Sequence, residues 1–502
     1  MKTILRLRPA AALILVATLL TRLPLARGQS GPRATPAEVA TAAAADPQLP
    51  DGPVKPTWDS IKAGYQVPDW WRDAKFGIMM HWGLYAVPAH GSEWYELHMY
   101  NNPAIIQWHQ EHFGPQDQFG YKDFIPKFTA AQWDPDAWAE LFKQAGARFV
   151  VPTAEHHDGF SLWDSAYNQY NAKLMGPKRD LIGDLAKAVR SKGLKFGVSN
   201  HSIEHYTFVQ TNASLATNDL YDPKWADFYS VANRYQPGDL QKFLTLWVAK
   251  NFELIDKYQP DLLWFDNGVN GRVFDPLKLK VAAYYYNRAK EWGKQVTLST
   301  KDSAYLAGSV MDYERMSRAP AQMTDYPWQV DDPVLYRFGY TADPEHPDIA
   351  KADGVVRNLI RNVSKNGGLL LNISPRADGI IPDNQQQLLR SIGKWLAVNG
   401  DAIYGTRPWT KAGEGTAAPR YCFTTKGDAL YAIALDWPGA EATVTSLAAG
   451  APGADKVNKV ELLGHDGPLE FTQDAGGLNV KMPADKPCDY AFALKISGLK
   501  PR

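Results

Sequence analysis

The chain has 502 residues, of which 54 are Lys or Arg and 54 are Asp or Glu, so its formal charge is zero. This balance excludes the basic surface typical of nucleic-acid-binding proteins, and we expect no nucleic-acid partner. Hydrophobic residues make up 45% of the chain, which is enough for a globular core. The length favours one large domain with a smaller one, or three small domains.

Aromatic residues are abundant, with 17 Trp and 24 Tyr. Flat aromatic faces stack on the C–H faces of sugar rings, so this composition favours a carbohydrate ligand. A core rich in tryptophan is the equally simple alternative.

The first 28 residues have the pattern of a secretory signal peptide. Three basic residues lie within the first eight, residues 10–20 are apolar, and small residues stand at 26 and 28. The apolar run is too short for a membrane span, and no later run is long enough. Removing residues 1–28 leaves 49 basic and 54 acidic residues. We therefore expect an exported, soluble protein, periplasmic or secreted, with no membrane partner.

Residues 29–57 are rich in Ala, Pro, Gly and Thr and offer little to bury. We interpret this segment as a disordered linker. The chain has two cysteines, Cys422 and Cys488. They allow one disulfide in an oxidising compartment, but they cannot form a zinc site by themselves.

The middle of the chain alternates between strand-like and helical patterns. Strands are predicted at 76–83, 147–157, 194–201, 260–267, 295–300, 308–314 and 368–374. Helices are predicted at 179–193, 239–258, 276–293, 352–365 and 383–398. Strands that alternate with long helices indicate a parallel sheet, and this number of strands favours an eight-stranded (β/α) barrel over 58–408. An open doubly wound sheet is the alternative, but no glycine-rich nucleotide loop follows an early strand.

After residue 408 the helical periodicity ends. Short β-like runs such as ALYAIALDW and DYAFALKIS alternate with Gly, Pro and Asp turns. Residues 409–502 are therefore predicted to form a small antiparallel β-domain, a sandwich. Bracing the barrel is the favoured role for this domain, and sugar binding is the alternative.

Ionisable residues stand at the ends of the predicted strands. In a (β/α) barrel these ends converge on the face that carries the active site. A single buried histidine is more often structural than catalytic, but six residues placed by one rule indicate a functional site. The six are His81, His156, His157, His201, Asp266 and Glu314.

Several long motifs resemble the α-L-fucosidases of glycoside hydrolase family 29. They include WWRDAKFGIMMHWGLYAVPA, SEWY, EHHDGFSLWDS, LLWFDNG and VSKNGGLLLNISPRADG, in order over about residues 58–409. The resemblance implies a (β/α) barrel that need not be regular and a C-terminal β-sandwich. It also implies a retaining exo-hydrolase that removes terminal α-L-fucose from fucosylated oligosaccharides or glycoconjugates without a metal or other cofactor.

The resemblance also implies site residues. Asp266 matches the family's nucleophile, and Glu314 is our match for the general acid/base, whose position varies in the family. The implied substrate-binding residues are His81, Glu93, Trp94, His156, His157 and, next to the nucleophile, Trp264. Many relatives have Tyr-Tyr-Ser after the third strand, where this chain has Ser199-Asn200-His201. We expect His201 to take the role of that tyrosine near the nucleophile.

The chemistry is consistent with these roles. A retaining glycosidase needs two carboxyl groups roughly 5–5.5 Å apart, one ionised and one that carries a proton near neutral pH. Neutral imidazoles donate and accept hydrogen bonds, so adjacent histidines can bind neighbouring sugar hydroxyls. Phe160 and Trp163 are predicted to be packing residues, with a contact to the sugar's methyl group as the alternative.

Three other functions remain as alternatives. Metal catalysis is disfavoured because adjacent side chains on an extended segment point to opposite sides, and no H-x-x-x-H spacing occurs. A secreted carbohydrate-binding protein without catalysis would not need both Asp266 and Glu314. An α-galactosidase is possible because L-fucose and D-galactose share hydroxyl geometry around the ring. The sequence favours no particular fucosidic linkage or oligomeric state.

Overall fold

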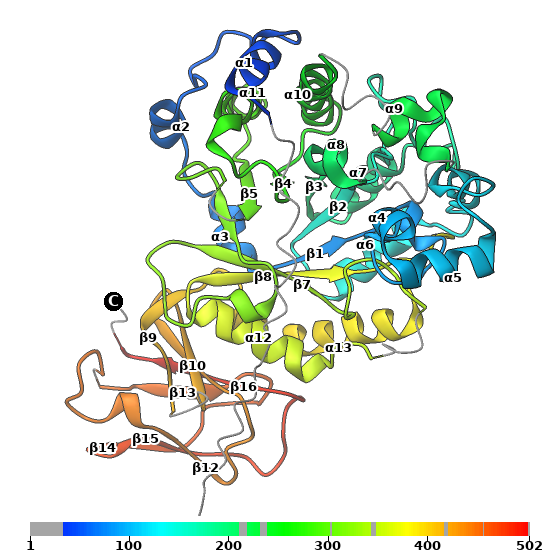
Figure 1. Cartoon of the computed structure of the whole chain (residues 1–502). Helices are drawn as coiled ribbons and strands as arrows, with labels where there is room; N and C mark the ends of the chain where they lie inside the picture. The colour runs from blue at the N-terminus through cyan, green and yellow to red at the C-terminus, as the bar shows by residue number, and fades with distance from the viewer. Residues whose placement is uncertain are drawn as a thin grey trace, which may run out of the picture.

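The computed structural model describes residues 34–209, 218–230, 238–301, 304–342, 348–415, 420–454 and 456–499. Within them, eight strands form a closed barrel in which each strand pairs in parallel with its neighbours in the chain and β8 closes on β1 (Figure 1). The strands are β1 Phe76–Met80, β2 Phe149–Glu155, β3 Lys195–Asn200, β4 Leu262–Phe265, β5 Thr297–Lys301, β6 Val310–Asp312, β7 Trp328–Pro333 and β8 Gly367–Ile373. The predicted barrel is confirmed.

The major helices cover the outside of this barrel. They are α6 Pro135–Gln144, α7 Leu181–Ser191, α10 Asp239–Tyr258, α11 Asp275–Glu291, α12 Ala352–Ser364 and α13 Asp383–Asn399. Other helices precede or connect them: α2 Trp58–Gly64, α3 Asp69–Ala74, α4 Tyr95–Asn101, α5 Pro103–Phe113, α8 His205–Phe208 and α9 Ala226–Tyr229. Among the described residues, no α-helix separates β5 from β6 or β6 from β7, so the barrel is irregular on this side.

Strand β7 was not predicted from the sequence. It carries Gln329, Asp331 and Asp332 and ends at Pro333, so its composition resembles a loop. In the structure β7 pairs with both β6 and β8, and Gln329 and Asp331 are buried. The polar side chains face a polar region of the barrel interior, where other strands supply their partners.

The prediction of a disordered linker is wrong for residues 34–57. Helix α1 (Pro36–Ala44) begins at Thr35 with a capping box to Glu38. Its Val39 and Ala42 are buried, and the helix packs against α10 and α11. The small apolar face of α1 is sufficient because the barrel helices supply a surface to cover. Residues 29–33 and the predicted signal peptide lie outside the described residues.

The C-terminal domain consists of two antiparallel sheets and lies against α12 and α13 (Figure 1). The first sheet has the order β13-β16-β11-β10-β9 and the second the order β12-β15-β14. Their strands are β9 Arg407–Glu414, β10 Tyr421–Lys426, β11 Ala429–Ala434, β12 Glu441–Val444, β13 Lys459–Leu462, β14 Phe471–Asp474, β15 Gly477–Lys481 and β16 Phe492–Ser497. The predicted antiparallel domain is confirmed, and its first strand begins two residues before the predicted boundary.

Two further features of the described residues bear on earlier expectations. Cys422 and Cys488 are both free. None of the helices in this part of the chain is long and apolar enough to cross a bilayer.

Candidate active site

The ends of the barrel strands bring the predicted residues together. His81 directly follows β1, His201 follows β3 and Asp266 follows β4, and all three are buried. His156 and His157 follow β2 and are also buried. Five residues that are up to 185 positions apart thus meet at the C-terminal end of the barrel, as the topology requires.

The carboxylate of Asp266 is held by three basic side chains. Its Oδ1 lies 2.6 Å from Lys301 Nζ, and its Oδ2 lies 2.9 Å from His201 Nδ1 and 3.5 Å from His157 Nε2. Burial alone would raise the pKa of Asp266, but Lys301 and the two histidines outweigh it and hold the pKa well below its ordinary value. Asp266 is therefore ionised at neutral pH, which a nucleophile requires.

Lys301, the last residue of β5, links the two predicted catalytic residues. Its Nζ lies 3.1 Å from Glu314 Oε2 as well as 2.6 Å from Asp266 Oδ1. Burial would lower the pKa of Lys301, but the carboxylates of Asp266, Glu314 and Asp331 raise it well above its ordinary value. Sequence reasoning missed this residue, although it directly follows the predicted strand 295–300 and the rule of strand ends applies to it.

Glu314 follows β6 and is more accessible than Asp266. Its side chain is 22% exposed, against 10% for Asp266, and it also contacts Arg318 at 3.7 Å. Because one oxygen of each carboxylate contacts the same ammonium nitrogen, those two oxygens are at most about 6 Å apart. The two carboxyl groups therefore face one small space.

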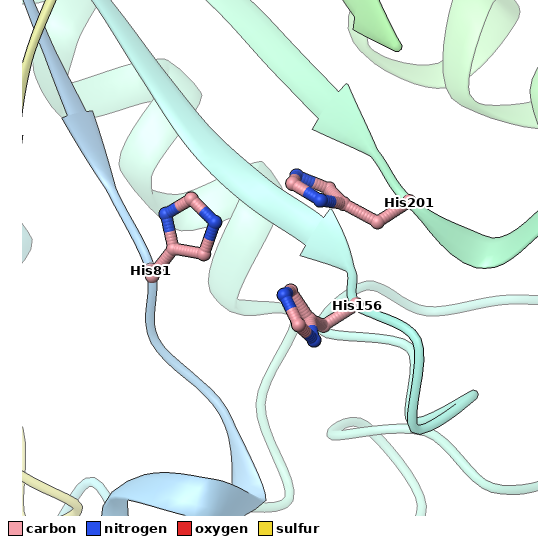
Figure 2. Close-up of side chains that lie close together, drawn as sticks. All are labelled: His81, His156 and His201. Carbon is pink, nitrogen blue, oxygen red and sulfur yellow. The ribbon is translucent and has the colours of Figure 1, made fainter. Parts of the chain in front are cut away.

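Three histidines, His81, His156 and His201, form a compact cluster around a shared space (Figure 2). Their ring centroids lie 4.9 to 5.4 Å apart. Burial lowers the pKa of all three, and that of His201 falls to about 3. The three imidazoles are therefore neutral at physiological pH, so each has one nitrogen that donates and one that accepts.

His157 differs from the other three. Burial would lower its pKa, but the carboxylates of Glu204 and Asp266 outweigh burial and raise it. Its Nδ1 lies 3.5 Å from Glu204 Oε2 and 3.1 Å from the backbone oxygen of His201. Burial in turn raises the pKa of Glu204 to about 7. Glu204 was also missed from the sequence, although it stands three residues after the strand-end His201.

The segment EHHDGF turns sharply after β2. The strand ends at Glu155, so His156 and His157 are not on an extended segment, and their ring centroids lie only 4.3 Å apart. The expectation that the two rings point to opposite sides is therefore wrong. The turn is completed by Gly159, which has a φ of +70°, and a Cβ there would lie 2.6 Å from the ring of His205.

Asp158 and the two aromatic residues after it support this turn. Asp158 accepts hydrogen bonds from the Tyr121 hydroxyl at 2.8 Å and from the Phe160 N–H at 3.1 Å. Phe160 and Trp163 are buried, and the Trp163 indole N–H donates to Glu253 at 2.8 Å. Both aromatic residues are packing residues, as expected.

Glu93 and Trp94 reach the same end of the barrel from the loop before α4. Glu93 Oε2 accepts hydrogen bonds from the N–H groups of Phe338 and Gly339, each at 3.0 Å. The Trp94 ring lies 5.9 Å from that of His157, centroid to centroid. Both residues are half-buried, and Trp94 lies beside His157 at this end of the barrel.

Trp264 has a different place from the one expected. Its exposed fraction is 0%, and its ring is covered by His201, at a centroid distance of 5.0 Å, and by Lys301. Its indole N–H donates to Asp312 at 2.8 Å. Trp264 therefore forms the floor beneath His201 and Lys301 rather than a surface that touches the sugar.

Two groups among the described residues have the spacing of metal ligands. One consists of His81, His156 and His201, and the other of His157, His201 and Asp266, with one possible ligand atom per residue and all atoms within 4.8 Å of one another. Each group uses only one of the adjacent histidines His156 and His157.

Comparisons with known proteins show the family of this chain. A family model described as "Alpha-L-fucosidase" matches residues 41–401, and one described as "Alpha-L-fucosidase C-terminal domain" matches residues 414–497. The tissue alpha-L-fucosidase of Bos taurus is 32% identical over 459 residues, which cover 89% of this chain and 91% of that protein. The human tissue alpha-L-fucosidase is 31% identical over 458 residues, with coverages of 89% and 92%.

Solved structures give the same result. The crystal structure of Thermotoga maritima alpha-fucosidase in complex with fucose has a TM-score of 0.69 and 30% sequence identity, and covers 88% of this chain and 99% of its own. The order of motifs, the barrel with its C-terminal β-domain and the matched length all lead to one conclusion. This chain belongs to the α-L-fucosidase family of glycoside hydrolases, family 29.

Proposed function

We propose that this protein removes terminal α-L-fucose from glycans by double displacement with retention, with Asp266 as nucleophile and Glu314 as general acid/base. The observation that supports this mechanism best is the shared contact with Lys301. It limits the separation of one carboxylate oxygen on each residue to about 6 Å, which suits a retaining enzyme with roughly 5–5.5 Å between carboxyl groups. Inverting enzymes need a gap of roughly 6.5–9.5 Å for a water molecule.

In the first step Asp266 attacks the anomeric carbon, and Glu314 donates its proton to the leaving oxygen. In the second step Glu314 takes a proton from water, and the water displaces Asp266. The low pKa of Asp266 keeps the nucleophile ionised. The greater exposure of Glu314 suits a group that must meet the aglycone and then water.

The neutral histidines supply the hydroxyl contacts of the sugar. His81 and His156 each present ring nitrogens at the cluster, and they can bind neighbouring ring hydroxyls of a 6-deoxy sugar. His201 acts mainly on the enzyme side, because its Nδ1–H donates to Asp266. It thereby orients the nucleophile, the role expected for the residue that replaces tyrosine.

The test of the nucleophile uses Asp266→Asn, which is nearly isosteric and cannot attack. We expect kcat/KM on an aryl α-L-fucoside to fall by several orders of magnitude with an unchanged melting temperature. In an Asp266→Gly variant, added azide should restore turnover and give the inverted β-fucosyl azide. Near-wild-type activity of Asp266→Asn would disprove the assignment. A parallel assay on an aryl α-galactoside tests the alternative substrate, and we expect little turnover.

The test of the acid/base relies on leaving groups. Glu314→Ala should slow hydrolysis of natural fucosides far more than that of a dinitrophenyl fucoside, because a good leaving group needs no protonation. Azide should then rescue turnover with retention. Glu93→Ala and Glu204→Gln are matched controls, which should affect good and poor leaving groups about equally. A leaving-group dependence in either control and not in Glu314→Ala would transfer the role to that residue.

We also propose that the protein is exported by residues 1–28. The supporting pattern is the basic start, the apolar run and the small residues at 26 and 28. N-terminal sequencing of the protein from the natural host should give Gln29 as the first residue. A mature protein that begins at Met1 would exclude cleavage.

A further inference from the structure

The cluster of His81, His156 and His201 has the geometry of a three-histidine metal site. One ring nitrogen of each residue lies within 4.8 Å of the others, and the rings stand at the ends of three adjacent strands (Figure 2). Three imidazoles with one open position form a well-known ligand set for Zn²⁺. In a tetrahedral site with Zn–N bonds of about 2.0–2.1 Å, the nitrogens would lie roughly 3.4 Å apart. Side-chain rotations that move each nitrogen by about 1 Å therefore suffice to bring the three nitrogens to this spacing.

The hydrogen bonds of His81 leave its Nε2 free. Its Nδ1 lies 2.7 Å from Asn372 Oδ1, and Asn372 is oriented by donating its Nδ2–H to the backbone oxygen of Phe338 at 2.8 Å. His81 therefore carries its proton on Nδ1, and Nε2 keeps its lone pair. A histidine that ligates a metal usually has this arrangement, with its other nitrogen donating to a fixed oxygen.

His201 has the same arrangement with a stronger acceptor. Its Nδ1–H donates to Asp266 Oδ2 at 2.9 Å, which leaves the lone pair on Nε2. Nε2 lies 3.0 Å from the Ser199 hydroxyl, and that hydroxyl has a second acceptor in Thr153 Oγ1 at 3.2 Å. Ser199 can thus turn to Thr153 and release Nε2 without losing its own hydrogen bond.

His156 supplies a second, independent observation that points to a ligand. Its Nδ1 is buried and has no hydrogen-bond partner among the residues that the structure describes. A buried nitrogen without a partner costs free energy, which a ligand would recover. The side chain is only 3% exposed, so ordinary solvent contact does not satisfy it fully.

Charges of both signs surround the cluster. The carboxylates of Glu93 and Asp266 favour a positive charge at His81, whereas Lys301 opposes it there and His157 opposes it at His156. The second group, His157, His201 and Asp266, is less suitable. His157 already donates to the backbone oxygen of His201, and Asp266 is occupied by Lys301 at 2.6 Å.

We propose that His81, His156 and His201 bind one divalent transition-metal ion of the Zn²⁺ class, and that the bound ion inhibits the enzyme by occupying the place of the sugar. Catalysis itself uses no metal in this scheme. His201 lies in the segment Ser199-Asn200-His201, which stands where many relatives have Tyr-Tyr-Ser, so the third ligand is a departure from that pattern. Only the competition with sugar rests on the proposed function.

The binding test uses Co²⁺ as a spectroscopic probe on the full chain. We expect one equivalent of Co²⁺ to give the intense visible absorption of a four-coordinate site, and one equivalent of Zn²⁺ to abolish it. His156→Phe and His201→Asn should each weaken Co²⁺ binding at least tenfold. The asparagine amide can still donate to Asp266, but it offers no counterpart of Nε2. His465→Ala, which removes an exposed histidine of the C-terminal domain, should bind Co²⁺ like the wild type.

The competition test separates this inference from the proposed function. Zn²⁺ should raise KM for an aryl α-L-fucoside without changing kcat, EDTA should reverse the effect, and L-fucose should displace Co²⁺. Absence of the cobalt absorption, or the same Co²⁺ affinity in all three histidine variants, would overturn the metal site whatever the activity. Inhibition that lowers kcat with KM unchanged would overturn the overlap with the sugar. Co²⁺ binding without any fucoside hydrolysis would instead contradict only the proposed function.

Discussion

At the scale of single residues, the central feature is the lysine between two carboxylates. Lys301 forms contacts with Asp266 and Glu314 that no other side chain duplicates among the described residues. In the absence of sugar, its positive charge offsets the repulsion between two acids that lie close together, one of them buried. The charge of Lys301 is the largest single cause that lowers the pKa of Asp266.

Lys301→Met should therefore lower kcat/KM by roughly 10²–10³-fold, as the loss of a charged active-site contact does. It should also raise the pKa of Asp266, because burial would then be opposed only by the histidines. The acidic limb of the pH profile of kcat/KM, which reports ionisation of the nucleophile, should consequently shift to higher pH. The profile and the melting temperature should be measured together.

The matched control is Lys280→Met. Lys280 is also a buried lysine, but its Nζ donates to the backbone oxygens of Ala43 and Ala45 at the end of α1. We expect this change to lower stability and to leave the pH profile in place. An unchanged acidic limb in Lys301→Met would show that Lys301 does not control the nucleophile.

The site residues that can be predicted from the sequence are those that stand at the ends of predicted strands. Residues at strand ends converge, and this rule identified Asp266 and four histidines that the structure brings together. The same rule covers Lys301, but an isolated lysine is usually exposed, so nothing in the sequence distinguishes it from other lysines. Trp264 shows the opposite error, since its position next to the nucleophile in sequence did not reveal that its ring lies beneath the site.

At the scale of elements, the strands β4, β6 and β7 share a buried polar network under the site. Asp312 on β6 accepts hydrogen bonds from the Trp264 indole at 2.8 Å, from Gln329 Nε2 at 2.6 Å and from the Asp331 N–H at 2.9 Å. The carboxyl groups of Asp312 and Asp331 are also hydrogen bonded to each other. Burial, followed by the charge of Asp312, raises the pKa of Asp331 well above its ordinary value, so Asp331 carries the shared proton.

If Asp331 carries the proton, substitutions of Asp331 and Asp312 should lower the unfolding free energy by different amounts. Asp331→Asn replaces a neutral acid by a neutral amide that still donates to Asp312, and we expect a change in unfolding free energy below about 1 kcal/mol. Asp312→Leu leaves the indole of Trp264 and the amide of Gln329 without an acceptor, which should cost roughly 2–4 kcal/mol. Urea denaturation at pH 7 measures both. Equal losses in the two variants would contradict the location of the proton.

The elements that can be predicted from the sequence are those with a clear apolar pattern. Helices α7, α10 and α13 have clear apolar periodicity and were predicted within about two residues of their observed ends. Strand β7 was missed because its polar side chains face Asp312 and Lys301, and a strand that packs against charges lacks the apolar pattern. Helix α1 lies in a segment whose composition resembles a linker, and only the capping signal of Thr35, Pro36 and Glu38 marks its start.

At the scale of the whole molecule, the barrel and the C-terminal domain share one hydrophobic core. Buried residues of the first C-terminal sheet, among them Tyr431 and Ile433, belong to the same apolar cluster as the barrel. One link is Trp395 on α13, which is 1% exposed and donates its indole N–H to the backbone oxygen of Ala491 at 2.8 Å. A second, smaller cluster fills the space between the two C-terminal sheets.

The shared core supports bracing as the role of this domain. Family models cover the two parts separately, at residues 41–401 and 414–497, yet α12 packs directly on β9 and β10. Removing the domain would expose the outer faces of α12 and α13 to water. Since α12 leads into β8, which closes the barrel on β1, the effect would reach the strand that positions His81 through Asn372.

We therefore predict that the barrel and the C-terminal domain unfold together in one calorimetric transition. Trp395→Ala should lower the unfolding free energy by roughly 3–5 kcal/mol, the usual cost of deleting a large buried aromatic, and should shift that single transition without splitting it. Trp437→Ala is the control, because Trp437 packs on Phe492 in the separate C-terminal cluster and is only partly buried. It should cost about 1–2 kcal/mol, since less apolar surface is lost. If Trp395→Ala produced two resolved transitions, one of them with the midpoint of the wild type, the domains would be independent and the bracing role would fail.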